Sequence, residues 1–239
     1  MAVTGASSGI GEATAHACAR AGAAVAIAAR RKNRVDALAE RINGEGGRAV
    51  AFETDVSDED ECRAFVDGAV GELGRLDVLV NNAGVMHLGP IEDAPTDEWR
   101  RMVNVNVLGL LYCTHAAIPH LRRSGAGHIV NVSSVGGRVV GHWSGVYSAT
   151  KFAVGTLSEA LRRELMDAGI RVTVVEPGRV DTELRTHVRP EVLEQLGGAF
   201  ANVTPITSEE LADTIVWALT QPANVNVNEL LIRPLISPM

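Results

Sequence analysis

The chain has 239 residues, of which 46% are hydrophobic and 21% are charged, as is typical of a globular protein with a sizeable core. The formal net charge of −7 argues against sequence-independent binding of nucleic acid, which depends on a basic face. No signal peptide and no apolar run of the roughly 18 residues that a membrane span needs is present, which predicts a cytoplasmic protein without a membrane partner.

Short apolar runs alternate with amphipathic stretches along the chain. The expected strands, in chain order, are Ala2–Thr4, Ala24–Ala28, Ala49–Glu53, Val78–Asn81, His128–Ser133, Arg171–Glu176 and Leu230–Arg233. The expected helices lie near Gly9–Ala21, Arg34–Asn43, Glu59–Leu73, Thr96–Arg123, Val146–Ala168 and Ser208–Leu219. This alternation predicts an α/β fold whose doubly wound parallel sheet (a Rossmann fold) has about seven strands and helices on both faces. No Pro-, Gly- or Ser-rich linker interrupts the pattern, so residues 1–239 are expected to form a single domain with ligands at the carboxyl ends of its strands.

A glycine-rich loop follows the first expected strand and opens the first helix. Glycines at such a turn let the backbone approach a dinucleotide pyrophosphate, which the positive end of the helix stabilises. A purely structural turn is the alternative, but the position directly after the first strand favours the dinucleotide. The residues expected to bind it are Gly5, Ser7, Ser8, Gly9, Ile10 and Gly11. The strand before Gly5 is shorter than the usual length of about five or six residues, so we expect the natural chain to begin somewhat earlier.

The end of the second expected strand bears on the choice between NAD and NADP. An acidic residue there would bind the ribose 2′-hydroxyl of NAD and repel a 2′-phosphate. The strand instead runs into three cations, Arg30, Arg31 and Lys32. Guanidinium groups suit bidentate phosphate binding, so we predict NADP(H) as the cofactor, recognised by Arg30 first and by Arg31. A solvated basic turn is the alternative.

Tyr147 and Lys151 are four residues apart, which places a phenol and an ammonium on the same face of a helix. Reduction of a carbonyl needs a proton donor, and a phenol with a pKa of about 10 is a poor one at neutral pH. A neighbouring cation favours the phenolate and lowers that pKa. The pair therefore predicts Tyr147 as a general acid and base assisted by Lys151.

Together these motifs resemble the short-chain dehydrogenase/reductase family, over essentially the whole chain. The features that carry the resemblance are the glycine loop, Asn81-Asn82-Ala83-Gly84, Ser134, Tyr147 with Lys151, and Pro177-Gly178. The resemblance implies hydride transfer between a nicotinamide and the carbonyl or alcohol carbon of a small molecule, with the members assembled into homodimers or homotetramers. Longer relatives that act on nucleotide sugars carry a separate substrate domain, for which 239 residues leave no room.

The resemblance also implies roles for individual residues. Ser134 would polarise the substrate carbonyl, while its neighbour Ser133 is expected to face the other way. Asn106 would complete the catalytic set by bending its helix and holding a water for proton relay to Lys151, with Asn104 as the competing assignment. Lys151 and Tyr147 would also bind the nicotinamide ribose. The further residues implied to contact the cofactor are Asp55, Val56, Asn82, Ala83, Gly84, Pro177, Gly178, Val180 and Thr182.

The substrate is the least determined part of the prediction. The resemblance places its contacts in residues 136–146 and in a loop near 183–206. A basic cluster in the second segment, formed by Arg179, Arg185, His187 and Arg189, either attracts a carboxylate or is a solvated lid balanced by nearby acids. Met86, His87 and Trp143 are candidate pocket walls. The C-terminal stretch 224–234 resembles a subgroup of NADP-dependent reductases that act on hydroxy acids.

Two further expectations concern metals and catalysis. The three cysteines (Cys18, Cys62 and Cys113) contain no CxxC pair and the histidines show no ligand spacing, so neither a disulfide framework nor a metal site is expected. The alternative to an enzyme is a catalytically silent NADP(H)-binding regulatory or scaffold protein, which would be expected to have lost a member of the catalytic set. None is missing.

Overall fold

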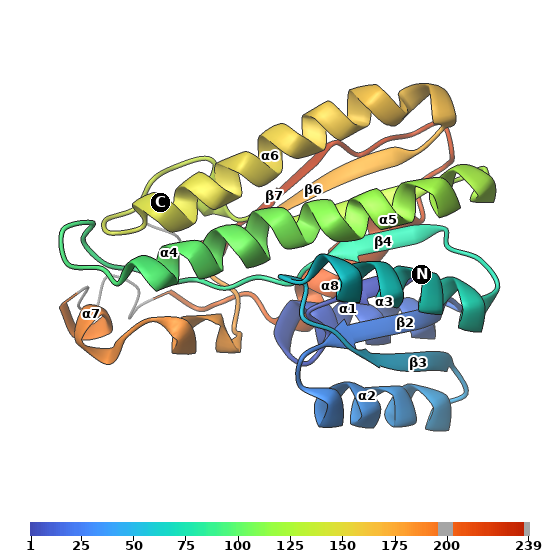
Figure 1. Cartoon of the computed structure of the whole chain (residues 1–239), viewed down its shortest axis with the longest axis horizontal. Helices are drawn as coiled ribbons and strands as arrows, with labels where there is room; N and C mark the ends of the chain where they lie inside the picture. The colour runs from blue at the N-terminus through green and yellow to red at the C-terminus, as the bar shows by residue number, and fades with distance from the viewer. Residues whose placement is uncertain (196–202, 237–239) are drawn as a thin grey trace.

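Seven parallel strands form one sheet in the order β3-β2-β1-β4-β5-β6-β7 in the computed structural model, which describes residues 1–195 and 203–236 (Figure 1). The strands are β1 (Ala2–Thr4), β2 (Ala24–Ala29), β3 (Arg48–Glu53), β4 (Val78–Asn81), β5 (His128–Val132), β6 (Arg171–Pro177) and β7 (Glu229–Ile232). The order reverses direction at β1, so a crevice opens between the loops that follow β1 and β4. The predicted doubly wound sheet is confirmed.

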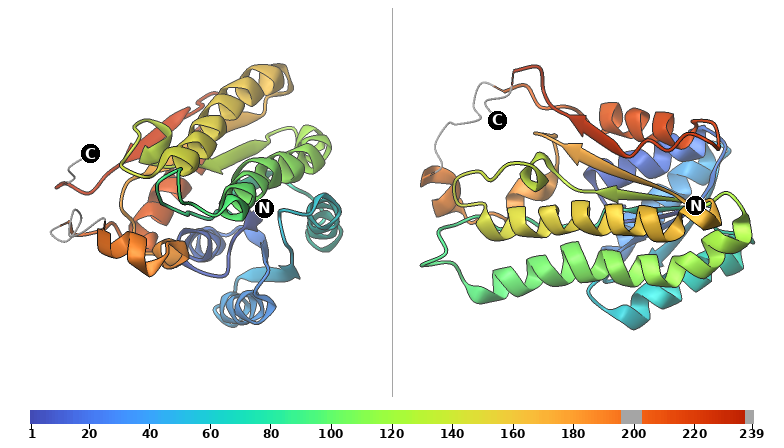
Figure 2. Two further views of the ribbon diagram at one scale, coloured as in Figure 1. Left: turned by 60° about the vertical axis from the view of Figure 1, so that its left-hand side comes forward. Right: turned by 90° about the horizontal axis from the view of Figure 1, so that it is seen from above.

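The helices are α1 (Gly9–Arg20), α2 (Lys32–Gly44), α3 (Glu59–Leu73), α4 (Thr96–Val103), α5 (Gly109–Ser124), α6 (Gly145–Leu165), α7 (Pro190–Gln195) and α8 (Ser208–Leu219). Helices α1, α2 and α8 cover one face of the sheet, and α3, α5 and α6 cover the other (Figure 2). The short turns are η1 (Asn104–Leu108), η2 (Val135–Gly137), η3 (Met166–Ala168) and η4 (Glu183–His187).

Alternation along the strands builds two cores from one sheet. In β2, Val25 and Ile27 pack with α1, α2 and α8, while Ala26 and Ala28 face the opposite cluster. Both sets are fully buried, which explains why the strand reads as a continuous apolar run. The three thiols are free and buried within these layers.

The long helix expected at Thr96–Arg123 is interrupted. A π-helical turn, η1, separates α4 from α5, although the helical path continues to Ser124. Length and composition alone would let the stretch Thr96–Ser124 cross a membrane, so the expectation that no such segment exists is wrong on those criteria. However, 44% of its most apolar window is buried inside the protein, as in a core helix, and α5 packs against α3.

The region expected to form a substrate loop contains structure of its own. The turn η4 and the short helix α7 occupy its first half, and neither was predicted. Residues 196–202 of that loop lie outside the described residues.

Candidate active site

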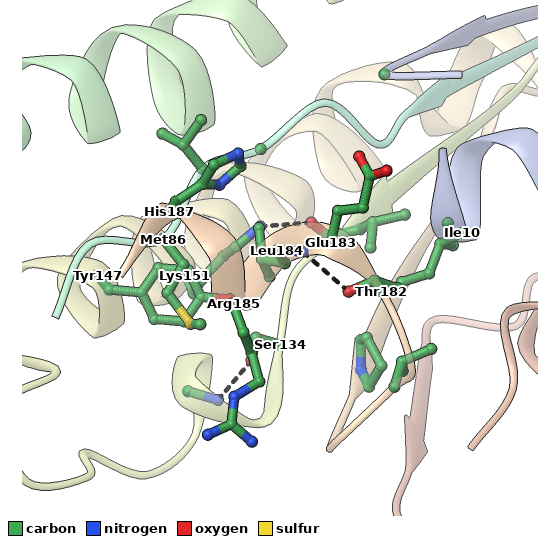
Figure 3. A pocket seen from close by; sticks show the side chains of 18 of the residues that line it. Ile10, Met86, Ser134, Tyr147, Lys151, Thr182, Glu183, Leu184, Arg185 and His187 are labelled. Carbon is green, nitrogen blue, oxygen red and sulfur yellow. Dashed lines mark hydrogen bonds between the residues drawn. The ribbon is translucent and has the colours of Figure 1, made fainter. Parts of the chain in front are cut away.

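A cavity of about 670 Å³ opens at the carboxyl end of the sheet, lined by the loops that follow β1 to β6. Every residue predicted to act in catalysis or to bind the cofactor lines it except Gly11 and Asn106. Figure 3 shows Tyr147, Lys151 and Ser134 grouped on one side of the cavity and Ile10 with Thr182 on the other. The fold therefore gathers residues from six loops at one place.

The glycine loop is held against the end of β4 by Asn82. Its side-chain amide donates to the main-chain oxygens of Thr4 and Gly5, at 3.0 and 3.2 Å. In return the Thr4 hydroxyl accepts hydrogen bonds from the backbone N–H groups of Asn82 and Ala83, both at 3.1 Å. A Cβ at Gly5 would lie 2.7 Å from the Ala83 backbone, and φ at Gly5 is +65°, so both space and conformation require glycine there.

Helix α1 begins beside the cavity with its first turn uncapped. Ser8 is the N-cap residue, but its side chain makes no capping hydrogen bond. Unpaired N–H groups at a helix start form an anion site, and Ile10 and Thr182 flank it. The Thr182 hydroxyl accepts from the backbone N–H of Leu184 at 3.3 Å and so begins η4. These features fit a pyrophosphate.

Arg31 lines the cavity beside the glycine loop, at the end where we expect the adenosine. Its guanidinium donates to the hydroxyls of Ser7 and Ser8, each as close as 2.8 Å, and to the Glu183 carboxylate at 2.7 Å. Glu183 also accepts from Arg34 at 2.7 Å, and these two hydrogen bonds, that from Arg34 first, lower the pKa of the Glu183 carboxyl to about 2. The ion pair therefore links the end of β2 to the segment after β6.

Arg30 lines the cavity but makes fewer contacts with the protein than Arg31. Its side chain is half exposed and lies 4.0 Å from the Asp55 carboxylate, without a hydrogen bond to the glycine loop. Asp55 is committed to its own turn, where it accepts from the N–H and hydroxyl of Ser57. Val56 is buried at the cavity edge.

Tyr147 and Lys151 lie on the same face of α6, with the Lys151 Nζ 5.9 Å from the centre of the phenol ring. Both residues are buried, and the ammonium donates to the main-chain oxygen of Val132 at 2.9 Å. Ser134, just after β5, lines the same cavity as the phenol. The Ser133 hydroxyl instead donates to the main-chain oxygen of Lys151 at 2.9 Å, so it fixes α6 against β5.

Burial shifts the ionisation of both groups. It raises the pKa of the Tyr147 phenol above its usual value, and the Ser134 side chain opposes that rise. Burial also lowers the pKa of the Lys151 ammonium to about 8. The acidic phenol stays a prediction, in which Lys151 and the positive charge of a bound nicotinamide both favour the phenolate.

Asn106 lies in the π-helical turn and is buried, whereas Asn104 is exposed. The Asn106 amide accepts from the backbone N–H of Val85 at 2.8 Å and donates to the Val85 oxygen at 2.9 Å and the Thr150 hydroxyl at 3.1 Å. Asn106 does not line the cavity, but it lies close to Lys151: a Cβ built on Gly84 would be within 3.7 Å of both Asn106 Oδ1 and Lys151 Nζ. The Asn106 side chain thus connects the segment after β4 to α6.

Asn81 is part of the sheet rather than of the cavity. Its amide donates to Thr114 and Asn131, both at 2.9 Å, and Asn131 donates to Ser158 at 2.8 Å. This buried polar ladder joins β4, β5, α5 and α6 beneath the site.

The members of the expected basic cluster do not share one environment. Arg189 is paired with acids, at 3.3 Å from Glu98 and 3.4 Å from Glu191. Glu183, one of the acids near the cluster, is paired with Arg31 instead. Met86, His142 and His187 line the cavity, whereas His87 and Trp143 do not. Within residues 1–195 and 203–236, no group of three or more His, Cys, Asp or Glu side chains could hold a metal ion.

Ion pairs around the cavity were missed by the sequence analysis, among them Arg31 with Glu183 and Arg138 with Glu176. Their partners are 152 and 38 residues apart in the chain, so no local spacing could have indicated them.

Comparison with known proteins agrees with this geometry. The family model described as short chain dehydrogenase matches residues 1–193. An uncharacterized oxidoreductase of Staphylococcus saprophyticus is 38% identical over 238 residues, covering 98% of this chain and 95% of that protein. An alcohol dehydrogenase from the archaeon Thermococcus sibiricus, solved in complex with 5-hydroxy-NADP, is 29% identical with a TM-score of 0.89, covering 100% of this chain and 97% of that one.

A serine dehydrogenase solved in a closed form with NADP+ is 30% identical with a TM-score of 0.89, covering 97% of this chain and 93% of that one. These likenesses extend over nearly the full length of the chain. On the matching family model and the identity to its relatives, the chain belongs to the short-chain dehydrogenase/reductase family of oxidoreductases.

Proposed function

We propose that the protein is an NADP(H)-dependent carbonyl reductase or alcohol dehydrogenase acting on a small aldehyde, ketone or hydroxy acid. The observation that carries the proposal is the meeting of Ser134, Tyr147 and Lys151 in one cavity with the uncapped start of α1. A phosphate site and a proton donor in the same crevice suit a nicotinamide dinucleotide and a carbonyl substrate.

NADP(H) fits the adenosine end of the cavity. Arg31 aims its guanidinium at the Ser7 and Ser8 hydroxyls, and these three side chains together would hold a 2′-phosphate. Asp55 is turned toward Ser57, so it is not positioned as an acceptor for the 2′-hydroxyl of NAD. The neighbours solved with NADP or its derivative support the same choice. When bound, the nicotinamide would supply or accept the hydride.

The protein's own groups would handle the proton. For reduction, Ser134 and Tyr147 would both donate hydrogen bonds to the carbonyl oxygen, and Tyr147 would transfer its proton as negative charge develops there. Lys151 would hold the phenolate by its charge and would bind the ribose hydroxyls that relay the replacement proton. Asn106 would keep the turn beside Lys151 in place through its bonds to Val85. Oxidation uses the same groups in reverse.

The substrate would enter between Ser134 and the segment from Thr182 to Gln195. Apolar side chains predominate on that side of the cavity, namely Met86, Leu88, Val135, Val139, Leu184 and Leu193. This composition favours a carbonyl compound with a compact apolar part, and His142 and His187 supply the polar contacts.

We also propose that two copies associate through α5 and α6 into a homodimer or homotetramer in the cytoplasm. Val103 at the end of α4, which leads into α5, and Phe152 on the adjoining α6 are 41% and 43% exposed and would lie in an isologous interface. Three buried free thiols accord with a reducing compartment.

The test is a panel of 4-nitrobenzaldehyde, acetophenone and succinic semialdehyde, with NADPH oxidation followed by absorbance. We expect turnover with at least one compound and a clear preference for NADPH over NADH. The silent-binder alternative predicts NADPH binding without turnover of any aldehyde, ketone or oxo acid.

A further inference from the structure

Arg138 and the buried Glu176 form an ion pair close to the site but outside the catalytic set. The Arg138 guanidinium donates from Nε and from a terminal nitrogen to the two oxygens of Glu176, both at 2.7 Å. The Glu176 side chain is only 3% exposed, so this bidentate contact supplies the partner that a buried carboxylate requires. The same terminal nitrogen of Arg138 also contacts Glu229 of β7.

The position of Arg138 in the chain connects this pair to Ser134. Ser134 is the N-cap of the turn η2, and its hydroxyl accepts from the backbone N–H of Gly136 at 3.0 Å. The backbone N–H of Arg138 closes the turn on the oxygen of Val135 at 2.9 Å. A shift of Arg138 would therefore shift Ser134.

The turn also has little space on its other side. A Cβ at Gly137 would lie 2.7 Å from the Ser133 hydroxyl and 2.8 Å from the main-chain oxygen of Lys151. The turn is thus pressed against α6 while Arg138 anchors its far end to β6. Both constraints act on the backbone that carries the Ser134 hydroxyl.

Glu176 brings in the second loop of the site. It directly precedes Pro177-Gly178, which line the cavity, and the Gly178 N–H is held by the Ile232 oxygen at 2.7 Å. The ion pair therefore ties the loop after β5 to the loop after β6 at the place where both border the nicotinamide end.

We infer that Arg138 is a positioning residue: its bidentate contact with Glu176 sets the distance between the Ser134 hydroxyl and the Pro177-Gly178 turn. Arg138 itself does not line the cavity, so it acts through Ser134 and not on the substrate. This inference rests on the proposed function, because it assigns a support to the carbonyl-binding group of that reaction.

The primary test is Arg138→Lys, which keeps the charge but cannot form the two-pronged contact. We expect kcat for 4-nitrobenzaldehyde, or for the best compound of the panel, to fall by about 10- to 100-fold, because small displacements of reacting groups have effects of this size. The Kd of NADPH, measured by fluorescence, should stay within about threefold, because the contacts of Arg31 are unchanged. Arg162→Lys is the matched control, since Arg162 forms a bidentate but exposed pair with Glu159 on α6.

A double-mutant cycle separates positioning from general stabilisation. If Arg138 acts through Ser134, Arg138→Lys should cost nothing further in a Ser134→Ala background. Multiplicative losses of kcat, or a loss of melting temperature with unchanged kcat per folded molecule, would overturn the inference. Should Arg138→Lys fail to fold, the neutral pair Arg138→Gln with Glu176→Gln replaces it in the same cycle. If the single variant Ser134→Ala leaves kcat unchanged, the proposed role of Ser134 fails and the inference fails with it. If Ser134→Ala lowers kcat but Arg138→Lys does not, the inference fails and the proposed function stands.

Discussion

The two ends of the cavity are held by different kinds of contact. At the adenosine end, Arg31 and Glu183 are each more than 40% exposed and form an ion pair that water and salt can weaken. Lys151 and Asn106, at the end that holds Tyr147, are at most 6% exposed; Lys151 donates to Val132, and Asn106 bonds to Val85 and Thr150. Replacing a side chain of the exposed ion pair should therefore change the free energy of binding only slightly. Replacing a buried side chain at the other end should cause a large loss of activity or of stability.

The largest effect is expected at the buried end, from Tyr147→Phe. Removal of the phenol hydroxyl removes the proposed proton donor, so kcat should fall by about 10³-fold while the Kd of NADPH stays nearly unchanged. Steady-state kinetics and fluorescence titration measure the two quantities. Tyr112→Phe alters the other tyrosine of the chain and is the control. Retention of most of the activity by Tyr147→Phe would disprove its role as acid and base.

A loss of similar size, but in stability, is expected from Asn106→Ala. The backbone N–H and oxygen of Val85 would both lose their partner inside the protein, which costs about 4 kcal/mol of the free energy of unfolding. Urea unfolding of this variant should be compared with that of Asn104→Ala, whose side chain is exposed and should contribute less than about 0.5 kcal/mol. Equal effects of the two variants would contradict the bracing role of Asn106.

Lys151 gives the buried end a pH dependence that the arginines of the other end lack. Its pKa is about 8 in the folded protein against 10.5 for the free group, so the unfolded chain binds more protons between these pH values. The stability of the wild type should therefore rise with pH across this window relative to Lys151→Met, by about 3 kcal/mol at most. Lys32→Met, which removes the exposed lysine, should produce no such difference when unfolding is measured from pH 7.5 to 10.5.

Arg31→Ala tests the exposed end. Loss of its charged hydrogen bonds to a 2′-phosphate should weaken NADPH binding by about 30-fold, with little change for NADH. Arg30→Ala is the matched control and should have a smaller effect, because that side chain has no contact with Ser7 or Ser8. A greater loss from Arg30→Ala would restore the leading role predicted from the sequence.

The smallest expected effect is a gain in affinity for NADPH. Glu183 occupies the guanidinium of Arg31, so a 2′-phosphate has to compete with it. Glu183→Gln should therefore tighten NADPH binding by about three- to fivefold without tightening that of NADH, a change within the range of an exposed ion pair. Asp181→Asn removes the same charge two residues earlier. A similar gain from that variant would point to net charge instead of competition at Arg31.

The sequence predicted the sheet well because each strand lies inside a continuous apolar run and each covering helix has a one-sided pattern. It placed Tyr147 and Lys151 on one face of a helix because they are four residues apart, and they share that face in the structure. The resemblance indicated that Asn106 bends its helix, and the π-helical turn lies there, but its partner Val85, 21 residues away, was not predicted. The ion pairs of Glu183 and Glu176 were missed for the same reason, as folding alone brings their partners together. The burial that raises the pKa of Tyr147 is likewise a property of the folded chain, which spacing does not report.

Asn82 also determines which side of the crevice can move. By donating hydrogen bonds to the main-chain oxygens of Thr4 and Gly5, it joins the ends of β1 and β4 into one rigid side of the crevice. Entry and departure of a dinucleotide then depend on the opposite side of the crevice. There Thr182 is held by its turn, and Glu183 by its ion pair with Arg31. Amide hydrogen exchange should accordingly be slow around Asn82 and fast from Glu183 to His187, and the rate of that opening would set an upper limit on product release.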